Sequence, residues 1–346
     1  MIIHVVGARP NYVKAAPLIR EIDWCEQLVI NTSQHYSDNM SKDIMKSVGM
    51  PNPDIYLPVV KDDPISRFSK ITEGLYSIIK ERQPSAVVVY GDVDSTLSAA
   101  IATKKNGAKL VHIESGLRSF DDSMPEEVNR KMVDSVSDIC FVTEESGLEN
   151  LKGHTGEVLM VGNTMIDTLV WVKRAMGGVF RPKPNHEYIL LTVHRPSNVD
   201  NEQSLKKIVD MCEDIDMKIV WPVHPRTMNN LKKYGLLERV FGMEHVCIED
   251  PMTYISFLSY INNSFAVITD SGGIQEETTF LGVNCYTVRK NTERPVTINL
   301  GTNRLIEIEG VAQAVLEQEG SAQGVIPPLW DGKASERISS YLKELV

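Results

Sequence analysis

Residues 2–14 read IIHVVGARPNYVK, and this stretch decides the fold. Ile2–Val6 is apolar and β-branched apart from its histidine, as expected for a parallel strand covered on both faces. Gly7 and Ala8 turn the chain, and Pro10 suits a first helical turn, where its missing N–H is not needed. The stretch therefore predicts a strand, a turn and a helix, the repeating unit of a doubly wound α/β fold.

The same unit recurs along most of the chain. Further strands are expected at 28–31, 86–90, 110–113, 139–142, 158–161, 188–193, 218–223, 245–248, 266–269 and 285–288. Gly and Pro cluster in residues 177–184, which indicates a linker, and the helix expected at 334–345 returns to the first half. We therefore expect a GT-B type α/β fold, in which two Rossmann-like doubly wound domains have the active site in the cleft between them. The first domain is expected at 1–165 plus 330–346, and the second at 166–329.

The amino-acid composition indicates which binding partners are disfavoured and in which cellular compartment the protein is expected. The 346 residues carry a net charge of −10, which disfavours a nucleic-acid or anionic-membrane surface. Five scattered cysteines without a C-x-x-C pair are typical of buried thiols in a reducing compartment. With neither a leader pattern nor an apolar run of about 18 residues, the protein is expected to be cytoplasmic.

The sequence lacks the motifs of three common classes of α/β protein: dinucleotide-binding enzymes, phosphate-loop enzymes and serine hydrolases. The sequence has no G-x-G, which disfavours a dinucleotide cofactor, and no G-x-x-x-x-G-K-[ST] phosphate loop. G-x-S-x-G is also absent, which disfavours a serine hydrolase of the α/β type.

Polar residues gather where the expected strands of the first half end. Arg9 and Lys14 flank a helix N-terminus, which suits either a diphosphate or a solvated turn. Asp92-Val93-Asp94 allows a metal site, but a cap by Asp94 or Ser95 on the helix that follows is favoured. Glu114 stands directly at a strand end, a position typical of functional residues in this fold class. Glu126 and Arg130 share one helix face, where an i,i+4 ion pair does not exclude a role in catalysis.

The second half repeats this pattern with different chemistry. His194-Arg195 and His224 follow two strands, and each histidine suits either a structural or a functional role. Ser271-Gly272-Gly273 opens a helix whose first turn can cradle a phosphate. Glu277 lies farther along the same helix, where it can accept hydrogen bonds from ribose hydroxyls.

Taken together, the motifs resemble those of the non-hydrolysing UDP-N-acetylglucosamine 2-epimerases. The matching segments follow the family's order over nearly the whole chain: GARP at 7–10, GD at 91–92, HIESGLR at 112–118, PEEVNR at 125–130, TVHR at 192–195, PVH at 222–224, DSGGIQEE at 270–277 and TERP at 292–295.

The resemblance implies a site and a substrate. Its catalytic candidates are Asp92, Glu114, Glu126 and His194. Its substrate-binding positions are Arg9, Lys14, Arg130, His224, Phe257, Ser271, Gly272, Gly273, Glu277 and Arg294. It implies a UDP-sugar bound chiefly by the second domain, with no cofactor or metal, and Asp94 departs from the family pattern in a way that weakens the metal interpretation. A homodimer serving polysaccharide biosynthesis is also expected.

Carbon 2 of a UDP-sugar has no adjacent carbonyl, so its proton is not acidic in the ground state. We therefore expect UDP to leave first, carbon 2 then to lose its proton, and UDP to return to a 2-acetamidoglucal intermediate. Two alternatives stay open: a 2-epimerase of a related UDP-sugar such as UDP-2,3-diacetamido-2,3-dideoxyglucuronate, and a non-catalytic nucleotide-sugar-binding regulator.

Overall fold

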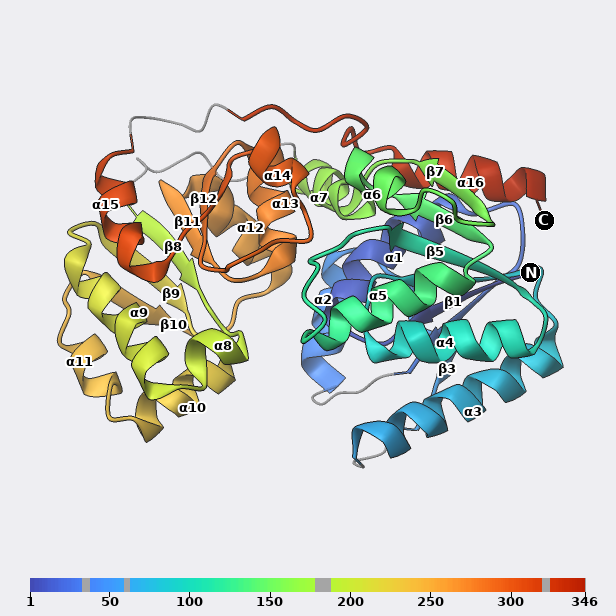
Figure 1. Cartoon of the computed structure of the whole chain (residues 1–346), viewed down its shortest axis with the longest axis horizontal. Coiled ribbons are helices and arrows are strands. Elements are labelled where there is room, and N and C mark those ends of the chain that lie inside the picture. The colour runs from blue at the N-terminus through green and yellow to red at the C-terminus, as the bar shows by residue number, and fades with distance from the viewer. Residues whose placement is uncertain (33–37, 59–62, 178–187, 319–323, 346) are drawn as a thin grey trace. The chain divides into compact units, whose positions relative to one another are not determined.

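The computed structural model describes residues 1–32, 38–58, 63–177, 188–318 and 324–345. The chain divides into two units, the first comprising Met1–Val172 and Pro328–Val346 and the second Lys173–Pro327. Each unit is a parallel sheet with helices on both faces, shown in Figure 1. This is the Rossmann-like pair expected from the sequence. Most of the expected linker, residues 178–184, lies outside the described residues.

The first unit is built on a seven-stranded parallel sheet in the order β3-β2-β1-β4-β5-β6-β7. Its strands are β1 Ile2–Val6, β2 Gln27–Asn31, β3 Ile55–Tyr56, β4 Ala86–Tyr90, β5 Lys109–Ser115, β6 Ile139–Val142 and β7 Glu157–Met160. Every residue of β1 and β4 is buried, which confirms that their apolar runs are covered on both faces.

Helices connect and cover these strands. They are α1 Arg9–Glu21, α2 Asp38–Ser47, α3 Pro64–Arg82, α4 Asp94–Lys105, α5 Pro125–Val136, α6 Glu145–Asn150, α7 Thr164–Ala175 and α16 Ala334–Leu345. The core on one face of the sheet joins Ile3 and Val87 of the central strands to Leu75 and Ile79 of α3.

The C-terminal helix α16 packs on the first unit, against α1. Both Asp167 carboxylate oxygens accept hydrogen bonds from its first amides, those of Ala334 at 3.1 Å and Ser335 at 2.6 Å. Trp24 Nε1 also donates a hydrogen bond of 3.0 Å to Oγ of Ser339, a residue of α16. The bounds of α16 agree with those expected from the sequence.

The second unit has a six-stranded parallel sheet in the order β10-β9-β8-β11-β12-β13. Its strands are β8 Tyr188–Thr192, β9 Lys218–Pro222, β10 Val246–Glu249, β11 Ala266–Thr269, β12 Asn284–Thr287 and β13 Asn303–Leu305. Its helices are α8 Pro196–Val199, α9 Glu202–Asp214, α10 Pro225–Lys233, α11 Leu237–Phe241, α12 Tyr254–Asn263, α13 Gly272–Leu281, α14 Val296–Asn299 and α15 Val311–Leu316. The edge strands β3 and β13 are additions to the sequence-based expectation.

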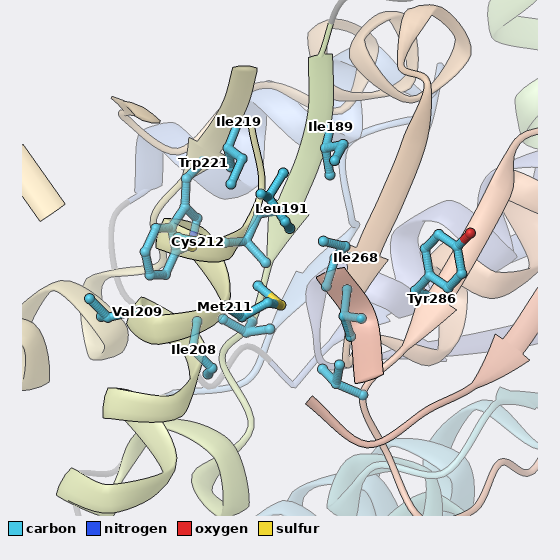
Figure 2. Packing of buried hydrophobic residues seen from close by; sticks show 14 of the residues in the cluster. Ile189, Leu191, Ile208, Val209, Met211, Cys212, Ile219, Trp221, Ile268 and Tyr286 are labelled. Carbon is cyan, nitrogen blue, oxygen red and sulfur yellow. The ribbon is translucent and has the colours of Figure 1, made fainter. Parts of the chain in front are cut away.

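Amphipathic helix α9 closes one face of the second sheet. Figure 2 shows its side chains Ile208, Met211 and Cys212 together with Leu191 of β8 and Trp221 of β9. All five are buried, so this packing fixes the strand ends from which the site residues project. Across the described residues, no helix has the length and apolar character needed to cross a membrane.

Candidate active site

The order of strands in each sheet marks one position for a ligand. In the first sheet, β1 lies beside β4, and the crossover connections run in opposite directions from this pair. In the second sheet, β8 and β11 form the equivalent pair. Loops that leave the carboxyl ends of such neighbouring strands diverge and leave room for a ligand. The site residues of each unit are therefore expected in these loops.

Asn11 joins the loop after β1 to the end of β4, the two neighbouring strands at which the crossover direction reverses in the first sheet. Its Oδ1 accepts hydrogen bonds from the amides of Gly7 and Ala8, both at 3.1 Å. Its Nδ2 donates to the Tyr90 carbonyl at 2.9 Å. The loop after β1 is thus tied to the end of β4 by one buried side chain, which the sequence analysis did not single out. Arg9, at the first position of α1, is exposed.

Lys14 and Glu114 form a buried ion pair at this edge of the sheet. Gly91 makes room for it, since a Cβ there would lie 2.9 Å from Lys14 Nζ and 3.5 Å from Glu114 Oε2. Gly91 also has a φ of +63°, which glycine adopts without strain. Glu114 has a φ of +68° at an irregularity in β5, a costly conformation for a side-chain-bearing residue. The sequence suggested Lys14 for a diphosphate, whereas the structure places it on a carboxylate.

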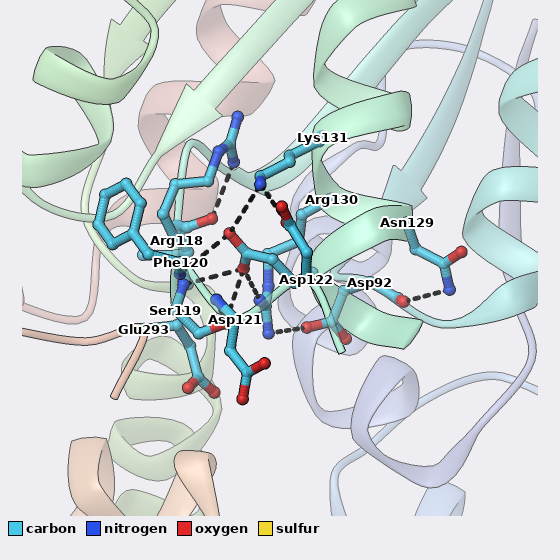
Figure 3. Close-up of polar contacts among 12 residues, drawn as sticks. Asp92, Arg118, Ser119, Phe120, Asp121, Asp122, Asn129, Arg130, Lys131 and Glu293 are labelled. Carbon is cyan, nitrogen blue, oxygen red and sulfur yellow. Dashed lines mark hydrogen bonds and ion pairs between the residues drawn. The ribbon is translucent and has the colours of Figure 1, made fainter. Parts of the chain in front are cut away.

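Arg130 of α5 joins Asp92 to a second carboxylate (Figure 3). Its Nη2 lies 2.6 Å from Asp92 Oδ2, and its Nη1 lies 2.6 Å from Glu127 Oε2. Glu127 is fully buried and also accepts hydrogen bonds from the amides of Ser119 at 2.8 Å and Phe120 at 3.2 Å.

Glu126, the carboxylate expected to act from this helix, lies on its exposed side. Glu127 holds the buried position, because the start of α5 at Pro125 sets which residue faces inward. The i,i+3 spacing of Glu127 and Arg130 was the available signal for this pair.

Asp94 does not cap the helix that follows β4, and that expectation was wrong. Helix α4 begins at Asp94 itself, and the N-cap residue is Val93. The Asp94 carboxylate accepts a hydrogen bond from Asn129 Nδ2 at 3.2 Å and lies 3.6 Å from Arg67. The same Asn129 amide donates to the Asp92 carbonyl at 2.9 Å, as drawn in Figure 3, so α5 holds both residues of this loop.

Asp270 organises the corresponding loops of the second sheet. This fully buried carboxylate accepts from the amides of His194 at 3.0 Å and Arg195 at 2.9 Å, and from Asn198 Nδ2 at 2.9 Å. Burial by itself raises the pKa of Asp270, but the His194 ring, followed by the Arg195 amide and Asn198, outweighs it and holds the pKa below its ordinary value. Asp270 was not among the residues predicted for the site, although its place directly after β11 was an available signal.

Two histidines lie close together at this edge of the second sheet. His194 Nδ1 lies 3.2 Å from Asp270 Oδ1, so this carboxylate orients its ring. The centroids of the His194 and His224 rings are 5.5 Å apart. His224 occupies the N-cap position of α10, where its Nδ1 accepts from the Arg226 amide at 3.1 Å.

The N-terminus of α13 carries the Ser-Gly-Gly segment. Ser271 holds the N-cap position, but its side chain makes no capping bond within the described helix terminus. A Cβ on Gly272 would lie 2.5 Å from Arg294 Nη1, so this glycine allows the guanidinium to approach the first helical turn. Arg294 pairs with Glu276 at 2.9 Å and with Glu293. The helix terminus offers amides and the positive end of its dipole to a phosphate, while two carboxylates already hold the neighbouring guanidinium.

Glu277 is buried within α13. Burial raises its pKa to about 8, with a further increase from Glu276 and an opposing hydrogen bond from Tyr254. Phe257 lies half-buried on α12, the helix that packs against α13. The structure thus places Ser271, Gly272, Gly273 and Arg294 together, with Glu277 farther along α13.

Comparisons with known proteins agree over nearly the full chain. A model of the family described as UDP-N-acetylglucosamine 2-epimerase matches residues 19–343. A UDP-N-acetylglucosamine 2-epimerase of Methanocaldococcus jannaschii is 35% identical in an alignment that covers 96% of each chain. A UDP-2,3-diacetamido-2,3-dideoxy-D-glucuronate 2-epimerase of Pseudomonas aeruginosa is 31% identical in an alignment that covers 99% of each chain.

The solved structures extend this agreement to the fold. The crystal structure of the Methanocaldococcus jannaschii UDP-GlcNAc 2-epimerase in complex with UDP-GlcNAc and UDP has a TM-score of 0.88 to this chain. The two are 32% identical, and the similarity covers 99% of both chains. This likeness confirms the expected GT-B type of fold.

Proposed function

The chain belongs to the UDP-N-acetylglucosamine 2-epimerase family and is an isomerase, and on that premise we propose that it interconverts UDP-N-acetylglucosamine and UDP-N-acetylmannosamine. One observation in particular supports this activity. The ion pairs Lys14–Glu114 and Arg130–Asp92 bring two carboxylates and two cations to the carboxyl ends of adjacent strands β4 and β5. Groups that exchange protons, beside groups that hold anionic oxygen, are what the reaction requires.

We propose that the reaction proceeds by elimination and re-addition. The bond between carbon 1 and the diphosphate oxygen breaks, and UDP leaves with the electron pair. The positive charge that develops at carbon 1 acidifies the carbon 2 proton, which passes to an enzyme base to give 2-acetamidoglucal. UDP then bonds again to carbon 1, while carbon 2 receives a proton on its opposite face. The sequence is redox-neutral, so it requires no cofactor.

Proton exchange on the two faces of the sugar is assigned to the carboxylates of the first unit. Asp92 and Glu114 are the leading candidates, since each is held by a buried cation that limits its movement. Glu126 is retained as the third, because its exposed position allows contact with a ligand. Lys14 serves the Glu114 carboxylate in the free protein and helps to neutralise the departing diphosphate, together with Arg9.

Binding of UDP is assigned chiefly to the second unit. The amides of Gly272 and Gly273 at the start of α13, with Ser271 and Arg294, suit the diphosphate. His194 is oriented through Nδ1 by Asp270, so Nε2 is its nitrogen for the ligand, with His224 beside it. Glu277 is assigned to the ribose hydroxyls and Phe257 to the neighbouring part of the nucleoside. Arg130 acts from the first unit by holding Asp92.

A related UDP-sugar is the second candidate substrate. The Pseudomonas aeruginosa relative named for a diacetamido-dideoxyglucuronate matches the chain as completely as the N-acetylglucosamine enzymes do, at somewhat lower identity. Parallel incubations with each UDP-sugar alone, followed by proton NMR, distinguish them. We expect a manno epimer from UDP-N-acetylglucosamine. Turnover of the diacetamido sugar alone would replace the assignment, and UDP binding without turnover of either sugar would favour a regulator.

We also propose that the enzyme is a cytoplasmic homodimer. Val128, Met132 and Val136 follow one another at i,i+4 spacing on α5 and are 41%, 45% and 38% exposed. Three exposed apolar side chains in one stripe are typical of a helix covered by a partner. The five cysteines are all free thiols, as is usual in a reducing compartment.

A further inference from the structure

His112 lies within β5, where it is fully buried and where both of its ring nitrogens face acceptor oxygens. Nε2 lies 2.8 Å from the carbonyl of Gly91, the residue before Asp92. Nδ1 lies 2.7 Å from Asp134 Oδ1 of α5. The ring therefore connects the loop after β4 to helix α5 from beneath the edge of the sheet that carries the proposed site.

Asp134 extends this connection to the loop after β5. Its second oxygen accepts from the Gly116 amide at 3.1 Å and from Arg118 Nη1 at 2.6 Å. Burial alone raises the pKa of Asp134, but His112 and Arg118 outweigh it and hold the pKa below its ordinary value. The carboxylate is thus ionised and acts as an acceptor at both oxygens.

Of the two backbone segments held in this way, the one at Glu114 has a conformation that needs support. Gly91 and Glu114 both have positive φ, at +63° and +68°, and each adjoins or carries a proposed catalytic carboxylate. A side-chain-bearing residue keeps such a conformation only where its surroundings determine it. Gly116 follows Glu114 by two residues, so the hydrogen bond from its amide to Asp134 restrains the irregularity at Glu114. His112 likewise restrains the Gly91 carbonyl.

We propose that His112 and Asp134 are positioning residues, which fix the loops of Asp92 and Glu114 relative to each other. This inference rests on the proposed epimerase function. Neither residue is assigned a contact with the substrate. Since a displacement of about 1 Å at the reacting groups costs on the order of 100-fold in rate, releasing either bond is expected to lower kcat by roughly 10- to 100-fold. UDP binding, assigned chiefly to the second unit, should change by less than about threefold.

A matched control lies at the opposite end of the same strand. Asp138 accepts hydrogen bonds from the Leu110 amide at 2.7 Å and from Lys104 at 2.7 Å, so it joins the amino end of β5 to a cation. Asp138→Asn makes the same chemical change as Asp134→Asn. In each case a carboxylate that accepts hydrogen bonds from a backbone N–H and from a cationic side chain is replaced by a carboxamide. Asp138 lies at the far end of the strand from Gly91 and Glu114.

The test measures kcat and KM for the UDP-sugar, and the Kd of UDP, in wild type, Asp134→Asn and Asp138→Asn. We expect kcat to fall in Asp134→Asn with the Kd of UDP preserved, and both values to stay within about threefold of wild type in Asp138→Asn. Wild-type kcat in Asp134→Asn, or an equal loss in Asp138→Asn, would overturn the inference. An inactive wild type would overturn the proposed function and this inference with it.

Two further variants decide the question if Asp134→Asn does not fold. The amide nitrogen of Gln corresponds to Nε2 of histidine, and that of Asn corresponds to Nδ1. His112→Gln therefore retains the bond to Gly91 and loses Asp134, whereas His112→Asn does the reverse. Both should lower kcat at preserved UDP affinity because each releases one side of the connection. If a folded His112 variant keeps wild-type kcat, the positioning role is wrong.

Discussion

The guanidinium of Arg130 lies 2.6 Å from Asp92 Oδ2, so a buried cation on α5 holds a carboxylate of the loop after β4. Glu127 holds the same guanidinium from the other side and also anchors the amides of the loop after β5. Helix α5 therefore sets the positions of both loops. The catalytic assignments depend on this arrangement, and several measurements can test it.

Asp92→Asn and Glu114→Gln should each lower turnover by roughly 10²–10⁴, the usual contribution of an acid–base group, and leave UDP affinity nearly unchanged. The reason is that each variant removes a proton-exchanging oxygen while keeping the side-chain volume. Steady-state kinetics and calorimetric UDP titration provide the measurement. Asp94→Asn is the control, because Asp94 faces Asn129 and Arg67, and its turnover should stay near wild type. Near-normal turnover in both test variants would remove them from the catalytic list.

Glu126→Gln and Glu127→Gln should separate activity from stability at adjacent positions. Glu127 is buried on Arg130, so its change leaves a buried cation poorly compensated and should lower the free energy of unfolding by about 2–4 kcal/mol. Glu126 is exposed, so its change should lower turnover with a stability effect within about 0.5 kcal/mol. Urea unfolding together with kcat measures both. The structural assignment of Glu127 is wrong if the two stability effects are equal.

Glu277 should make the protein less stable as pH rises. Its pKa is about 8 in the folded protein against an ordinary 4.5, so unfolding releases its proton between these values. Its stabilising contribution is complete below about pH 4.5 and is lost as pH rises through 8, at up to ~1.4 kcal/mol per pH unit. Glu277→Gln should remove this decrease in the free energy of unfolding, as measured by urea unfolding between pH 5 and 8. The exposed Glu249→Gln should keep the wild-type pH dependence. An unchanged slope in Glu277→Gln would contradict the assignment.

Met132→Glu should convert the proposed homodimer to a monomer. The charge would enter the middle of the exposed stripe of Val128, Met132 and Val136, where burying it against a partner is costly. Sedimentation velocity at micromolar concentration measures the mass. Phe241→Glu is the control, because Phe241 is 60% exposed on α11, outside this stripe. A monomeric wild type, or a dimer in Met132→Glu, would reject this interface.

The fold could be predicted from the sequence because its central strands, such as Ile2–Val6 and Ala86–Tyr90, are buried on both faces and are therefore largely apolar. It missed β3 and β13 because strands of two and three residues have no period of their own and exist through pairing with a neighbour. The bounds of the expected strands agree with the structure to within about two residues, as is usual at element ends.

The strand-end positions of the candidate residues were easier to predict than their contacts. Strand-end residues such as Asp92, Glu114 and His194 follow from topology. Which residue of Glu126 and Glu127 faces inward depends on the rotation of α5, and the bond between His112 and Asp134 joins residues 22 positions apart. The i,i+3 spacing of Glu127 and Arg130 was a local signal for their pair, whereas the contact of His112 with Asp134 arises from tertiary packing alone.

Incubation of the purified protein with UDP-N-acetylglucosamine in deuterated water tests the central claim most directly. Proton NMR should show UDP-N-acetylmannosamine that carries deuterium at carbon 2 and remains joined to UDP, because the proton lost from that carbon is replaced from solvent. A sugar that keeps its carbon 2 proton, or a manno sugar released free of UDP, would contradict elimination and re-addition at this site.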